Sequence, residues 1–108
     1  MLALTVACVV ACSAGTAVQV ENLSATTLHD VRLTGSGFEA LLSKPLEPGE
    51  SRRVNVQPTG ETGVALSFRA GARRFEHGPQ GYFEGNGRYT VRVVVRDDFA
   101  STVHARLK

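Results

Sequence analysis

From position 18 onward, apolar residues alternate with polar or small ones almost throughout the chain, and this period of two most constrains the fold. The clearest segment, residues 88–96, places Tyr89 and valines on one face and Arg88, Thr90, Arg92 and Arg96 on the other. Such alternation is typical of a β-strand with one buried and one solvated face.

Turn-forming residues separate the alternating segments at short intervals. Examples are Gly35-Ser36-Gly37, Glu47-Pro48-Gly49-Glu50 and Gly85-Asn86-Gly87. Glycine supplies positive φ and proline presets the first turn residue, so these clusters favour tight turns. The pattern predicts strands near residues 18–22, 29–34, 38–43, 51–57, 63–69, 72–76, 88–96 and 102–107.

So many short strands in so small a domain predict an all-β fold, an antiparallel β-sandwich of immunoglobulin-like size with seven to eight strands. A small β-barrel is the alternative. The chain has no Trp and no cysteine after Cys12, so it lacks the Cys-Trp-Cys core of true immunoglobulin domains and the topology stays open. We expect the core to contain the inward-facing residues Val20, Val31, Leu33, Val54, Val56, Leu66, Phe68, Tyr89, Val91, Val93, Val95, Val103 and Leu107.

The first seventeen residues differ from the rest because they carry no charge. Residues 2–11 are apolar except Thr5, which matches a signal-peptide core and falls short of the ~20 residues of a membrane-spanning helix. Small residues follow. The sequence therefore predicts an export leader over residues 1–17 and a single domain over residues 18–108.

Two cleavage sites are open within this leader. Val9-Val10-Ala11-Cys12 resembles the lipobox of small bacterial lipoproteins, and the resemblance implies cleavage before Cys12, lipidation of that cysteine and a domain facing the periplasm. Ordinary cleavage after Ala17, which has small residues at both critical positions, would instead give a secreted or periplasmic protein. We favour the lipoprotein interpretation, since Cys12 has no later cysteine with which to form a disulfide.

The charged residues give a net charge of +2, and ten of the twelve basic residues are arginine. Several fall on the polar phase of the expected strands: Arg53, Arg69, Arg92, Arg96 and Arg106. A basic stripe of this kind could bind nucleic acid, lipid headgroups or a glycan polymer. We interpret it as a solvated face that discourages edge pairing, because no aromatic residues interleave with the arginines and an envelope location argues against nucleic acid.

Residues that could perform catalysis or hold a metal are scattered. Neither Ser51 nor Ser67 has the setting of a nucleophile elbow, and Asp97-Asp98 follows a strand end as turns do. No local metal-binding spacing joins the histidines, which are His29, His77 and His104. We therefore expect no catalytic residue, no metal and no cofactor. Asn22-Leu23-Ser24 matches a glycosylation sequon, which a bacterial lipoprotein would not use in the usual way.

Residues 78–87 are the one segment that suggests a contact site. They place Tyr82 and Phe83 in a glycine-rich connection, where we expect one ring to be buried and the other to be available to a partner. The sequence thus predicts a non-catalytic envelope lipoprotein, anchored in the membrane and contacting an envelope protein through a sheet edge or this loop. The alternative is a soluble secreted or periplasmic domain that binds a glycan or a metal.

Overall fold

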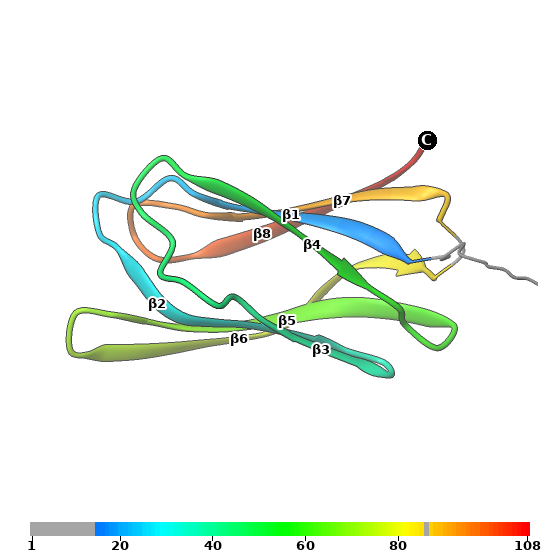
Figure 1. Cartoon of the computed structure of the whole chain (residues 1–108), viewed down its shortest axis with the longest axis horizontal. Coiled ribbons are helices and arrows are strands. Elements are labelled where there is room, and N and C mark those ends of the chain that lie inside the picture. The colour runs from blue at the N-terminus through cyan, green and yellow to red at the C-terminus, as the bar shows by residue number, and fades with distance from the viewer. Residues whose placement is uncertain (1–14, 86) are drawn as a thin grey trace, which may run out of the picture.

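The computed structural model describes residues 15–85 and 87–108, which form two four-stranded sheets packed face to face (Figure 1). Sheet A has the order β4-β1-β7-β8 and sheet B the order β3-β2-β5-β6. All pairs are antiparallel except β1 and β7, which run parallel. The strands are β1 (Thr16–Asn22), β2 (Leu28–Gly35), β3 (Phe38–Leu41), β4 (Ser51–Val56), β5 (Glu61–Ala70), β6 (Arg73–Glu84), β7 (Tyr89–Val95) and β8 (Ser101–Leu107).

The predicted β-sandwich is confirmed, and the alternative of a small β-barrel is wrong. The edge strands β6 and β8 meet at one side of the sandwich, but they belong to different sheets. The two strands are not paired through backbone hydrogen bonds. A side chain connects them instead: Gln80 Nε2 on β6 donates to the carbonyl oxygen of Ser101 on β8 at 3.1 Å. Each sheet therefore keeps its own edges. No helix in the described part of the chain has the length and apolar character needed to cross a membrane.

The strand boundaries agree with the alternation except in β6. The sequence predicts that this strand ends near residue 76, whereas it continues to Glu84 and includes most of the expected 78–87 loop. Its pairing with β5 shifts by one residue twice, between Thr62 and Val64 and between Val64 and Leu66. Bulges accommodate glycine and proline within a strand, so the residues that resemble a loop are bulged strand residues.

The core lies between the sheets and contains most of the residues predicted for it. Of these, Val54, Tyr89 and Val103 are partly buried, and Leu107 is wrong because 67% of it is exposed. Leu107 ends an edge strand and has a neighbouring strand on one side only, where it pairs with Tyr89 of β7. Further core residues that were not predicted are Val18, Leu28, Leu42, Leu46, Val64, Ala70 and Phe83.

Candidate binding site at the open edge of β8

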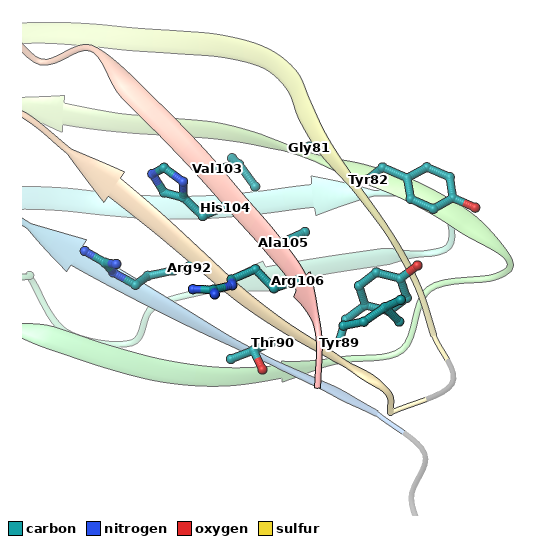
Figure 2. A pocket seen from close by; sticks show the side chains of 10 residues that line it. Gly81, Tyr82, Tyr89, Thr90, Arg92, Val103, His104, Ala105 and Arg106 are labelled. Atoms are coloured by element: carbon teal, nitrogen blue, oxygen red, sulfur yellow. The ribbon is translucent and has the colours of Figure 1, made fainter.

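A shallow depression of about 900 Å³ follows the outer edge of β8. Residues 103–107 of β8 form its length, and Gly81 and Tyr82 of β6 border it on the side of sheet B. Tyr89 and Arg92 reach it from β7. Figure 2 shows Tyr82 and Tyr89 on one side of the β8 ribbon and the side chains of Arg92 and Arg106 on the other.

Two tyrosine rings form the apolar wall of the depression. Tyr82 is 49% exposed, and its ring meets that of Tyr89 edge-on, with centroids 6.4 Å apart and planes at 71°. Tyr89 also contacts Phe83, which is fully buried. One ring of the predicted pair is therefore displayed and the other is in the core, so Tyr82 remains a candidate contact residue and Phe83 cannot reach a partner.

A hydrogen bond fixes the Tyr82 hydroxyl. Tyr82 Oη donates to Glu84 Oε2 at 2.9 Å, two residues along β6. This bond, aided by desolvation and nearby carboxylates, raises the pKa of Tyr82 to about 12. The phenol thus stays protonated at neutral pH and presents an uncharged ring face to the depression.

The opposite wall is cationic. Arg92, His104 and Arg106 project from the outer face of sheet A, and all three are exposed. Arg92 Nη2 lies 3.1 Å from Glu21 Oε1 on β1. Within residues 15–85 and 87–108, Arg106 forms no ion pair. An acidic group would therefore meet uncompensated positive charge at this end of β8.

The backbone of β8 is available along part of this edge. β8 is hydrogen-bonded to β7 on one side only. At its beginning β6 covers the other side, because Gln80 reaches Ser101 O and His77 Nε2 donates to Phe99 O at 2.9 Å. In the described chain no such side-chain bond reaches the backbone of residues 104–107, and an open edge of this kind can accept an added strand.

The remaining residues that the sequence singled out do not gather at one site. Cys12 lies outside the described residues. Asp98 accepts a hydrogen bond from the Ala100 amide at 3.0 Å in the β7–β8 turn, and Ser51 Oγ donates to Glu21 at 3.4 Å. Among the residues that the structure places, no three His, Cys, Asp or Glu side chains could share a metal ion.

The fold and this edge site define a β-sandwich with an open, mixed aromatic and cationic edge. No protein-family model matches the chain, and no curated protein matches it. The chain is similar to a protein from Eubacterium rectale solved by NMR, with a TM-score of 0.60 and 13% identity over 87% of this chain and 90% of that one. At that identity the likeness shows the fold alone.

Proposed function

We propose that this chain is a non-catalytic binding module of the bacterial envelope, anchored by a lipid on Cys12, which takes up an extended peptide along β8. The observation that carries the proposal is the open backbone of residues 104–107 beside the exposed Tyr82 ring. Pairing with an exposed edge gives affinity through main-chain hydrogen bonds, and flanking pockets give specificity.

The position of β1 supports an anchor at Cys12. β1 begins at Thr16, which is buried and whose hydroxyl donates to Glu84 O at 3.4 Å. Ala17 pairs with Asn55 on β4. Cleavage after Ala17 would remove both residues from the strand, whereas cleavage before Cys12 leaves β1 entire.

The two walls of the depression select the composition of the peptide. Successive side chains of an added strand point to opposite faces of the sheet. One set would lie over Arg106 and His104 on the outer face, and the other would lie beside Tyr82 and Leu107. The best ligand is therefore an extended peptide in which acidic and apolar residues alternate.

Two synthetic octapeptides test this selectivity, one alternating valine with glutamate and the other valine with lysine. They are titrated into the ¹⁵N-labelled full chain carrying Cys12→Ala. We expect the glutamate peptide to shift the backbone amides of residues 104–107 and to bind at least about tenfold more tightly than the lysine peptide.

Leu107→Ser is expected to weaken this binding about fivefold, equivalent to roughly 1 kcal/mol of apolar burial. Leu41→Ser is the matched control, because Leu41 is also exposed (56%) but lies on β3, an edge strand of sheet B. Equal effects of the two substitutions, equal binding of the two peptides, or shifts confined to β3 or β4 would each contradict the assignment.

A second candidate function uses the same depression. An exposed tyrosine beside arginines also suits a glycan, which would make the chain a soluble secreted or periplasmic ligand-binding domain. Chitohexaose is a direct probe. Shifts of the Tyr82 and Tyr89 ring resonances with chitohexaose, without any response to the peptides, would favour this function.

A further inference from the structure

The outer faces of the two sheets differ in charge balance. On sheet B each outward arginine has a carboxylate within ion-pair distance: Arg32 with Glu39 at 3.0 Å, Arg69 with Asp30 at 3.7 Å and Arg74 with Glu76 at 3.6 Å. These exposed pairs contribute little to stability. Because each arginine is matched by a carboxylate, the outer face of sheet B has a net charge close to zero.

The outer face of sheet A lacks this compensation. The strand register places Arg53, Gln19, Arg92 and His104 side by side across all four strands. The neighbouring row of outward residues, nearer the start of β1, includes Thr90 of β7 and ends with its partner Arg106 on β8. Among the described strand residues of this face the one carboxylate is Glu21, which pairs with Arg92, while Arg53 and Arg106 have no ion pair there.

This cationic face lies beside the beginning of β1, where the proposed anchor would join the domain. Thr16 is four positions after Cys12, a span of at most ~14 Å. Gln19, in the row of Arg53 and Arg92, is three residues further along β1, or about 10 Å. An acyl chain on Cys12 would therefore hold these arginines within ~25 Å of the bilayer surface.

We propose that the outer face of sheet A rests against anionic phospholipid headgroups. This rests on the proposed function for its tether, and the face shares Arg92, His104 and Arg106 with the peptide site at β8, whereas Arg53 on β4 belongs to the face alone. Guanidinium groups match phosphate oxygens in charge and geometry, and each basic residue near an anionic surface strengthens association roughly fivefold. A four-stranded face bearing exposed cations and small polar residues suits a broad headgroup layer.

Co-sedimentation with vesicles tests the face without the anchor. The full chain carrying Cys12→Ala is mixed with vesicles of phosphatidylcholine alone or of equal phosphatidylcholine and phosphatidylglycerol. We expect tighter binding to the anionic vesicles, and we expect the difference to disappear as salt is raised and the Debye length shrinks. The apolar leader is present in every sample. Its own contribution to vesicle binding is therefore the same for neutral and anionic vesicles and does not affect the difference between them.

Two double variants locate the effect. Arg53→Gln with Arg106→Gln, on sheet A, is expected to weaken binding to anionic vesicles on the order of thirtyfold. Arg32→Gln with Arg74→Gln, on sheet B, changes the net charge equally and is expected to weaken it less than about threefold. Circular dichroism confirms that both variants keep the fold.

Three results would overturn this assignment. They are equal losses in the two double variants, equal binding to neutral and anionic vesicles, and binding of soluble polyphosphate at Arg53 and Arg106 without binding to vesicles. The last would identify the face as a site for a soluble polyanion. Arg106 belongs to both proposed sites, so Arg53→Gln alone separates them: Arg53 lies on β4, at the opposite edge of sheet A from β8, and its loss should weaken vesicle binding and leave peptide binding unchanged.

Discussion

Gly81 of β6 faces the side chain of Val103 on β8 so closely that a Cβ atom on the glycine would lie 2.7 Å from Val103 Cγ1. Gly81 also has a φ of +75°, a backbone conformation that favours glycine. The contact sits where the two sheets meet at their edges. It therefore sets how closely β6 approaches β8, and with that the position of Tyr82 beside the open strand.

Gly81→Ala should destabilise the domain and shift β8. The added methyl group meets Val103, and the positive φ is strained for alanine, so we expect a loss of about 2 kcal/mol in the free energy of unfolding by urea. Gly78→Ala is the control on the same strand, because a Cβ there meets nothing within 4 Å and φ is not positive. It should change stability by less than about 0.5 kcal/mol. Similar losses in both variants would rule out the Val103 contact as the cause.

Asn22 is fully buried, and both the nitrogen and the oxygen of its side-chain amide form hydrogen bonds. Its Nδ2 donates to Thr26 O at 2.8 Å and to Leu46 O at 3.0 Å, and its Oδ1 accepts from the amide and hydroxyl of Ser24 at 2.9 and 2.7 Å. A glycan on Nδ2 would displace a bonded hydrogen inside the core. The sequon at 22–24 is therefore a structural loop motif in the folded domain.

Asn22→Ala should accordingly lower the free energy of unfolding by about 2–4 kcal/mol, because it removes four hydrogen bonds and leaves the buried Ser24 amide without its partner. Asn55→Ala, at an exposed asparagine of β4, is the matched control and should change it by less than about 0.5 kcal/mol. Thermal or urea unfolding followed by circular dichroism measures both. A small effect at Asn22 would mean that water replaces the amide.

Tyr82 should titrate unusually late. The chain has two tyrosines, and the hydrogen bond to Glu84 raises the pKa of Tyr82 to about 12. Tyrosinate absorbance should therefore show a component near pH 12 that Tyr82→Phe removes. Because the folded pKa lies above the unfolded value of about 10, this bond stabilises the fold fully below pH 10 and is lost as pH rises toward 12. Survival of the late component in Tyr82→Phe would assign it elsewhere.

The alternation of apolar and polar residues is enough to predict the β-sandwich fold. The candidate site depends on the order of the strands in each sheet, and the alternation does not encode that order. The alternation identifies β7 and β8 and the inward valines of β7. It cannot tell that β8 is an edge, so Leu107 is predicted to be buried although it is exposed. Nor does it bring β6 beside β8, since that contact joins two sheets that share no ladder.

The 78–87 segment shows a second limit. Gly78, Pro79 and Gly81 resemble loop residues, and only pairing with β5 turns them into bulges within β6. Tyr82 could be named from the sequence as a contact residue, together with Phe83, because the two aromatics lie in a glycine-rich segment and aromatic residues dominate interface hot spots. Tyr89, which contacts Tyr82, could not be named in this way. The alternation places Tyr89 on the inward face of its strand, and the structure shows it partly buried against the core.

The lipid anchor gives the last prediction, and the two cysteines provide their own control. If acylation occurs at Cys12, Cys12→Ala should abolish both membrane fractionation and incorporation of an alkyne-labelled fatty acid in bacteria that express the chain. Cys8→Ala should change neither, because Cys8 lies upstream of the proposed cleavage site and leaves with the leader. Intact-mass measurement should give a mature chain that begins at acylated Cys12. A mature chain that begins at Val18 without an acyl group would contradict the anchor, and β1 would then lack the buried Thr16.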